Sequence, residues 1–206
     1  MMEFFNYTYR AIRAVNVKIN NKISNFYTYC LIKINKVEIG KGFASSGIPI
    51  LFIHHTSKIK IGKNFKINNR ILSNPIGRNY KCLFAIRENA ELIIGDNVGF
   101  SGTTIVCGKG VNIGSHVKIG GNVCIYDTDF HSLNPKERAN AVKDKKGTSY
   151  KEVQIGNHVF IGAHSTILKG VTIGENSIIG ACSLVSKSIP ANEIWAGNPA
   201  RFIKKI

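Results

Sequence analysis

Three polar residues at alternate positions, Asp127, Asp129 and His131, carry the clearest chemistry in this sequence. An imidazole can accept and return a proton near neutral pH, and a neighbouring carboxylate can hold the ring in one tautomer. The triplet is therefore a candidate general base, His131, with Asp127 and Asp129 as the candidates for orienting it. The same pattern also suits a loop whose aspartates bond to their own backbone, so both interpretations stand.

The elements that must position these residues follow a strict period of six. Branched apolar residues recur at every sixth position of one stretch: Ile155, Ile161, Ile167, Ile173, Ile179 and Val185. Neither a helix nor a flat strand repeats in this way, whereas short straight runs separated by corners do. Three such sixes close one coil. The sequence therefore predicts an all-β solenoid of hexapeptide rungs in which each residue lies over the one eighteen positions later, such as Ile155 over Ile173.

The first half of the solenoid is less regular. Rungs are predicted at Ile39 and Ile61, and residues 43–55 (FASSGIPILFIHH) are expected to form one continuous apolar strand with Pro49 at an edge. Regular spacing returns from residue 94, with one extra residue that predicts a bulge at a corner. The expected inward residues there are Ile94, Phe100, Val106, Ile113, Ile119 and Ile125.

The repeat stops after Ile125 and restarts at Ile155. Residues 126–152 between them are polar, lysine-rich and aperiodic, so we predict that they leave the prism as an excursion loop. Long loops in compact repeat folds are usually functional. We therefore expect a β-helix domain over residues 37–189, with Asp127, Asp129 and His131 at the mouth of its excursion.

The two ends do not keep the period of six. In residues 1–36 apolar residues stand three or four apart, which predicts an amphipathic helix, and Asn20-Asn21 is expected to break it. One interpretation is a cap over the open first rung; the other is a basic helix lying on a membrane surface. We favour the cap. Residues 190–206 show no rungs and are expected to pack over the last coil. The apolar side of the helix predicted in residues 1–36 consists of Phe5, Tyr9, Ile12, Val15, Ile19, Ile23, Phe26 and Cys30.

Composition limits the partners. The formal net charge of +16 favours an anionic partner. It is spread along the chain without an RNA-binding or zinc-finger motif, so phosphate on a small molecule is favoured over nucleic acid. Five cysteines without a CxxC pattern predict reduced thiols, and neither an apolar run of membrane-spanning length nor a signal-like start is present. We expect a cytoplasmic protein, peripheral at the inner face of the membrane if its first helix binds lipid.

The remaining histidines raise the question of a metal site. His158 and His164 fall in consecutive sixes and therefore on different faces of the prism. His54 and His55 are adjacent in an expected strand, where neighbouring side chains point to opposite sides. Ligands would have to come from neighbouring chains. We expect no metal site.

The rungs of residues 94–185, the loop beginning DTDFH and the closing IPANEIWAGNPAR together resemble the hexapeptide-repeat acetyltransferases. The pattern is most similar to the maltose, galactoside and bacterial polysaccharide O-acetyltransferases. The resemblance covers residues 90–206 well, 37–89 loosely and 1–36 hardly at all. It implies a left-handed parallel β-helix, assembly as a homotrimer and acetyl-coenzyme A (acetyl-CoA) as co-substrate.

The resemblance also implies roles for individual residues. His131 matches the family's catalytic histidine. Arg138 and Ser101 match acceptor-binding positions, although some members have asparagine where Ser101 stands. The positions implied to hold the pantetheine arm and the phosphates of the coenzyme are Ala163, Ala181, Ser186, Lys187, Arg201 and Lys204.

The function that the resemblance implies is transfer of acetyl from acetyl-CoA to a sugar hydroxyl, in a surface or capsular polysaccharide or its precursor. N-acetylation of an amino sugar on a nucleotide and O-acetylation of serine remain as alternatives. A zinc enzyme similar to the γ-carbonic anhydrases is disfavoured by the histidine spacing. A catalytically silent scaffold is disfavoured by the presence of His131 and Lys187.

Overall fold

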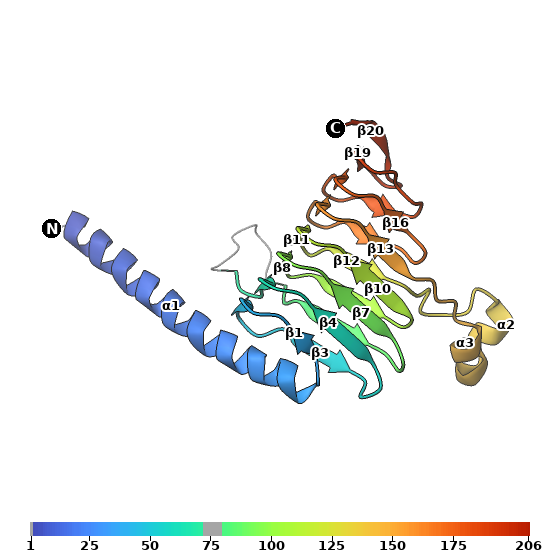
Figure 1. The fold of residues 1–206 in the computed structure, drawn as a ribbon, viewed down its shortest axis with the longest axis horizontal. Coiled ribbons are helices and arrows are strands. Elements are labelled where there is room, and N and C mark those ends of the chain that lie inside the picture. The colour runs from blue at the N-terminus through green and yellow to red at the C-terminus, as the bar shows by residue number, and fades with distance from the viewer. Residues whose placement is uncertain (1, 72–79) are drawn as a thin grey trace.

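The computed structural model describes residues 2–71 and 80–206, and its body is a three-sided prism of stacked β-strands (Figure 1). Among these residues the three faces hold six, eight and six strands, and from β1 to β18 successive strands along the chain pass from face A to face B to face C. All neighbouring strands are parallel except the last pair, β19 and β20. The predicted fold class, the hexapeptide solenoid of a left-handed parallel β-helix, is confirmed.

Each face is a ladder of short strands. Face A consists of β1 (Glu38–Ile39), β4 (Lys58–Ile61), β7 (Glu91–Ile94), β10 (Gly110–Ile113), β13 (Val153–Ile155) and β16 (Thr172–Ile173). Face B consists of β2 (Ala44–Ser46), β5 (Lys66–Asn68), β8 (Gly99–Ser101), β11 (Lys118–Gly121), β14 (Phe160–Ile161), β17 (Ile178–Ile179), β19 (Glu193–Ala196) and β20 (Arg201–Lys205). Face C consists of β3 (Ile50–Ile53), β6 (Leu83–Ile86), β9 (Thr104–Cys107), β12 (Cys124–Tyr126), β15 (Thr166–Ile167) and β18 (Leu184–Val185).

The inward residues of successive coils stack in the predicted register. Ile155 pairs with Ile173, and both side chains are buried in the prism. The same holds on the other two faces, where Ile161 pairs with Ile179 and Ile167 with Val185. Burying a branched side chain of this size contributes roughly 1.5–3 kcal/mol, so each coil is held mainly by its neighbours.

On β9 the inward residue is Ile105 rather than Val106, which corrects the prediction. Ile105 pairs with the buried Ile125, whereas Val106 pairs with Tyr126 on the outer side. The additional residues of this coil therefore lie in the corner between β9 and β10, at residues 108–109. A second irregularity, a register shift between Ile119 and Gly121, lies on face B.

Residues 43–55 form two strands rather than one. They divide into β2 on face B and β3 on face C. The corner between them contains Gly47, whose φ of +82° is a left-handed conformation that favours glycine, and Pro49. The apolar run therefore bends because the chain turns from one face of the prism to the next.

The end of the chain continues the solenoid, whereas no rungs were predicted there. Ile189 forms a parallel bridge with Ile173, and β19 pairs in parallel with β17. Only β20 turns back, antiparallel to β19. Residues 189–196 thus supply a further rung on faces A and B.

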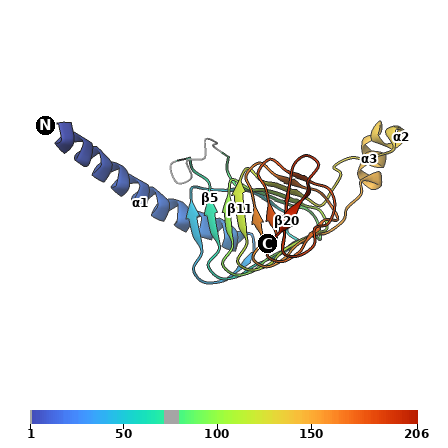
Figure 2. The same cartoon turned by 90° about the horizontal axis from the view of Figure 1, so that it is seen from above.

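Helix α1 (Met2–Ile34) is continuous through Asn20-Asn21, where a break was predicted. The Asn20 side-chain amide donates to the carbonyl of Asn16, 2.8 Å away, so it bonds within the helix. Figures 1 and 2 show that α1 leaves the first coil and extends to one side of the prism, so only its C-terminal part covers that coil. None of the helices in the described ranges has the length and apolar content required to cross a membrane.

The excursion predicted after Ile125 is present. The chain leaves the prism after β12, forms α2 (Pro135–Arg138) and α3 (Ala141–Gly147), and returns at β13 (Figure 1). A bridge between Thr128 and Tyr150 closes its base. The excursion lies on the opposite side of the prism from the free end of α1 in both views (Figures 1 and 2).

Candidate active site

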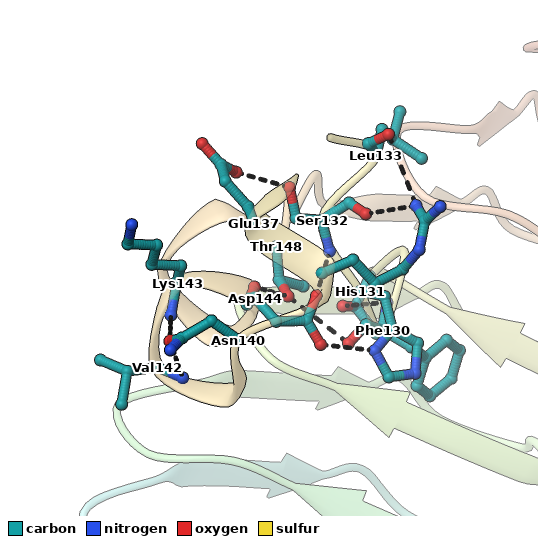
Figure 3. A network of polar contacts seen from close by, with 12 residues as sticks. Phe130, His131, Ser132, Leu133, Glu137, Asn140, Val142, Lys143, Asp144 and Thr148 are labelled. Atoms are coloured by element: carbon teal, nitrogen blue, oxygen red, sulfur yellow. Dashed lines mark hydrogen bonds and ion pairs between the residues drawn. The ribbon is translucent and has the colours of Figure 1, made fainter. Parts of the chain in front are cut away.

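The candidate site is built around His131, which lies in the excursion between β12 and α2. Its Nδ1 atom lies 2.7 Å from Oδ2 of Asp144, a residue of α3 (Figure 3). The other carboxylate oxygen of Asp144 accepts a hydrogen bond from the backbone N–H of Ser132, at 2.7 Å. The two oxygens of the Asp144 carboxylate therefore hold both the imidazole of His131 and the backbone of the next residue.

Local sequence explains how Asp144 reaches this position. Asn140 caps α3, and its side-chain oxygen accepts from the backbone N–H groups of Val142 and Lys143. This cap is the favoured start of a helix. It places Asp144 in the first turn, on the side that faces His131 (Figure 3).

The electrostatics of the pair suit a charged carboxylate beside an imidazole. The hydrogen bond from His131 and then that from the Ser132 amide hold the pKa of Asp144 below its usual value, and the nearby Arg138 acts in the same direction. The His131 side chain is 66% exposed, whereas that of Asp144 is only 15% exposed. The imidazole is thus anchored at Nδ1 and open to solvent beyond it, which a base acting on an external substrate requires.

Arg138 lies next to His131 but bonds to the loop itself. Its Nη1 atom donates to the carbonyl of Ser132 at 2.8 Å. The Ser132 hydroxyl in turn donates to Glu137, at 2.6 Å. Arg138 therefore fastens the turn that carries His131, while its predicted contact with the acceptor stays a prediction.

Neither Asp127 nor Asp129 orients His131, because both carboxylates bond elsewhere. Asp127 is fully buried, and its oxygens accept from the backbone N–H groups of residues 108, 109 and 110 at 2.6–2.8 Å. Asp129 pairs with Lys169 at 3.2 Å. Alternate residues share one side only in an extended strand, and here the chain turns at Phe130, whose φ is +67°.

The residue that sequence reasoning missed is Asp144. It follows His131 by thirteen positions in a segment without periodicity. The available signal was the combination of Asn140 as a helix cap with an acid in the following turn. Asp127 proves to be structural, since it ties the corner that contains the extra residues of the β9 coil.

An open pocket of about 930 Å³ lies near the base of the excursion, and no sequence pattern predicted it. Its lining includes Phe52, Arg87, Lys145 and Tyr150. Arg87 donates to the Tyr150 hydroxyl at 2.9 Å, and its guanidinium carbon lies 6.0 Å from the centre of that ring. Cations, a phenol and an exposed aromatic ring are therefore gathered beside the loop.

A column of side chains on face C connects this pocket with the excursion. Phe52, Ala85, Val106 and Tyr126 occupy paired positions on successive strands. The ring of Phe130 packs edge-on against Tyr126, with 5.1 Å between centroids. Because Phe130 directly precedes His131, the column ends beside the candidate base.

The positions implied to hold the coenzyme lie on the C-terminal coils. Ala163 and Ala181 occupy equivalent corners between faces B and C, where the Cys182 N–H donates to the Ala163 carbonyl. Ser186 and Lys187 are exposed at the corner that follows β18. Arg201 and Lys204 are exposed on β20, at the end of face B.

Within the described residues, no hydrogen bond or ion pair joins those coenzyme positions to His131. Ser101, at the end of β8, has its carbonyl bonded to the Asn122 N–H, and no described hydrogen bond connects it with His131. The predicted binding roles of these residues therefore remain predictions.

No group of three or more histidine, cysteine or acidic side chains suited to a metal ion occurs in residues 2–71 and 80–206. His158 stacks on His116 with ring centroids 4.7 Å apart, at a corner between faces A and B. His164 contacts the Asn122 amide at the next corner, so the two predicted candidates do lie apart. His54 and His55 occupy a turn with ring centroids 4.4 Å apart, so the argument that they face opposite sides of a strand is wrong.

Comparison with known proteins gives three informative similarities. Residues 152–187 match the family model for bacterial transferase hexapeptide repeats. A galactoside O-acetyltransferase of Lactococcus lactis subsp. lactis (strain IL1403) is 36% identical over 148 residues, which are 71% of this chain and 63% of that protein. A putative lipopolysaccharide biosynthesis O-acetyltransferase, WbbJ, of Escherichia coli (strain K12) is 29% identical over 75% of each chain.

A solved structure of a galactoside acetyltransferase in complex with coenzyme A superposes with a TM-score of 0.54. It is 31% identical in sequence, and the match covers 82% of this chain and 64% of that one. This chain therefore spans slightly less than two thirds of the length of both galactoside acetyltransferases.

Proposed function

The chain belongs to the hexapeptide-repeat acetyltransferases, and from that premise we propose that it transfers an acetyl group from acetyl-CoA to a hydroxyl of a sugar. The observation that carries this proposal is the pairing of His131 with Asp144 at 2.7 Å on the excursion loop. An imidazole fixed at one nitrogen by a carboxylate and exposed beyond it has the arrangement of a general base.

In the proposed reaction Asp144 holds the proton on Nδ1 of His131, which leaves Nε2 as the acceptor. Nε2 takes the proton of the sugar hydroxyl while the hydroxyl oxygen attacks the thioester carbonyl. The tetrahedral intermediate collapses as the carbon–sulfur bond breaks, and the imidazolium returns the proton to the departing thiolate. Backbone N–H groups at the site would stabilise the oxyanion.

Acetyl-CoA would lie along the C-terminal coils. The backbone at Ala163 and Ala181 is proposed to bond the pantetheine arm, which is extended and amide-rich. Exposed cations at Lys187, Arg201 and Lys204 are proposed to meet the phosphates, with Ser186 beside them. The net charge of +16 favours binding of such a polyanion.

The acceptor is proposed to occupy the pocket near the excursion. Phe52 and Tyr150 offer apolar and aromatic surfaces of the kind on which sugar rings pack, and Arg87 and Lys145 offer hydrogen-bond donors. Arg138 is proposed to take part in acceptor binding. Ser101 lies at the corner between faces B and C, away from this pocket, so its proposed contact would come from a second copy of the chain. Similarity to a protein named for lipopolysaccharide biosynthesis supports a unit of a surface or capsular polysaccharide, or its precursor, as acceptor.

Assembly and location are inferred from the family resemblance alone. We infer that three copies of the chain associate, and that the enzyme acts in the cytoplasm, where acetyl-CoA is available. Light scattering of the purified protein measures the first of these directly: a monomer across the micromolar range would contradict it.

The activity test is to incubate the purified protein with acetyl-CoA and a panel of glycans, measuring thiol release and the mass of each glycan. We expect glycan-dependent thiol release and acetylation at a hydroxyl, and loss of both in His131→Asn. Acetylation only of an amino sugar would replace the proposal with N-acetyl transfer. Thiol release that is the same with His131→Asn would overturn the assigned base.

A further inference from the structure

Helix α1 packs on the solenoid with its polar side. Ser24 and Thr28 are buried against the first coil, at 5% and 0% exposure. The Asn25 side-chain oxygen accepts from the Ser45 N–H at 2.8 Å, and the Ser24 hydroxyl accepts from the Gly47 N–H at 3.0 Å. Among the side chains of α1 whose burial is described, residues 6–34, Ile32 is the one large apolar side chain that is buried. Hydrogen bonds therefore supply much of the attachment of α1 to the prism.

The apolar side of α1 is left uncovered. Its side chains are each between 50% and 72% exposed: Tyr9, Ile12, Val15, Ile19, Ile23 and Phe26. At 100° per residue, Ile19 lies about 140° around the helix from Ser24 and about 180° from Thr28, so it points to the opposite side. A helix that only capped a soluble solenoid would turn its apolar stripe inward, so the observed orientation points to an external apolar partner.

Charge identifies the kind of partner. No acidic residue occurs between Glu3 and Glu38, whereas six basic residues do, all exposed: Arg10, Arg13, Lys18, Lys22, Lys33 and Lys36. Lys18 and Lys22 border the apolar stripe. A second copy of α1 would bring mainly further cations to this face, because Glu3 is the one acidic residue in the sequence of the helix. Anionic lipid headgroups supply negative charge beside an apolar layer.

We propose that α1 binds the surface of an anionic lipid bilayer, lying along it with its apolar side inserted between the headgroups. The helix extends sideways from the first coil (Figures 1 and 2), and the side chains of its apolar side are exposed. Binding in this way leaves the excursion, on the other side of the prism, accessible to the acceptor. The site is independent of the proposed transferase reaction.

The test is flotation of the full-length protein with two kinds of vesicle. One kind is phosphatidylcholine alone, and the other contains about 30% phosphatidylglycerol, which gives it an anionic surface. We expect co-flotation with the anionic vesicles that weakens as salt rises. Ile19→Glu should lower the partition coefficient about tenfold or more, because it places a charge where an isoleucine inserts. Asn20→Glu is the matched control, with the same change of charge at the adjacent exposed position off the apolar side, and should lower it by less than about threefold.

Three outcomes would overturn the proposal. The first is the absence of co-flotation of the parent protein with anionic vesicles. The second is an equal loss in Ile19→Glu and Asn20→Glu, which would show that general charge and not insertion governs binding. The third combines two results: the parent protein does not bind vesicles, and Ile19→Glu changes the oligomeric state measured by light scattering. Together they would assign the apolar side of α1 to a protein interface. Circular dichroism of both variants checks that the fold is retained.

Discussion

The Nδ1 atom of His131 lies 2.7 Å from Oδ2 of Asp144, although the two residues belong to different parts of the excursion. The carboxylate also binds the Ser132 N–H, so its position is fixed independently of the imidazole. The orientation of the candidate base is therefore set by the fold of α3 and not by the acidic residues that precede His131 in the sequence.

Asp144 is a positioning residue, and Asp144→Asn should lower kcat on the order of 10²-fold through misorientation of the imidazole. The pKa of Asp144 lies below its usual value, so the carboxylate stays charged throughout the neutral pH range. Because the carboxylate bonds the imidazole and the Ser132 N–H, its loss should leave the KM for acetyl-CoA near the parental value. Steady-state kinetics measures both parameters.

Glu137→Gln is the matched control for this variant, because Glu137 bonds the Ser132 hydroxyl and not the imidazole. Its kcat should stay close to that of the parent. A kcat that is unchanged in Asp144→Asn as well would show that the carboxylate does not act through His131.

His131→Asn should lower kcat by about 10²–10⁴-fold, the usual contribution of a general base. The side chain is 66% exposed and lies outside the core, so the fold and binding of acetyl-CoA should be retained. His158→Asn, at a corner of the prism, should keep nearly parental turnover. If His158→Asn lost activity and His131→Asn kept it, the assignment of the base would be wrong.

Asp127→Asn should reduce stability rather than alter the chemistry. The buried carboxylate accepts three backbone hydrogen bonds at the β9–β10 corner, and an amide nitrogen would face at least one of those donors. Leaving a buried donor unpaired costs about 1–3 kcal/mol, which thermal unfolding would detect as a lower Tm. The control is Glu175→Gln, at an exposed corner; equal Tm values for the two variants would contradict this role.

Gly162→Ala should destabilise the solenoid by about 1–3 kcal/mol, because the corners of adjacent coils are in backbone contact. A Cβ at Gly162 would lie 2.5 Å from the backbone nitrogen of Ala181. At Gly99 the nearest atoms are 3.7 Å away, on the flexible Lys118 side chain, so Gly99→Ala should be tolerated. Urea unfolding of both variants compares them, and an equal loss would show that corner spacing is not limiting.

Lys187→Ala should raise the KM for acetyl-CoA about two- to fivefold with little change in kcat, as expected for an exposed cation facing phosphate. The effect should shrink as salt screens the charge. Lys60→Ala removes an equally exposed lysine near the first coil and should leave KM unchanged. Identical KM values for the two variants at low salt would place the phosphates elsewhere.

The solenoid and its register could be predicted from sequence because the contacts are periodic. Each coil touches only its neighbours, so a branched residue at every sixth position determines both the inward face and the partner, as for Ile155 and Ile173. The prediction was wrong where the period was broken. At Ile105, the sequence does not show which side chain turns inward, because the added residues lie in a corner. In residues 43–55, the continuous apolar run conceals the turn at Gly47 from one face to the next.

Only the tertiary structure decided the chemistry of the site and the orientation of α1. The excursion has no repeat, so the pairing of His131 with Asp144 depends on where the cap at Asn140 starts α3. The sequence likewise determined the apolar stripe of α1, but hydrogen bonds from Ser45 and Gly47 decided which side of the helix meets the prism. Periodicity specifies contacts between equivalent positions, whereas contacts between unlike segments depend on directional bonds that exist only once both segments are folded.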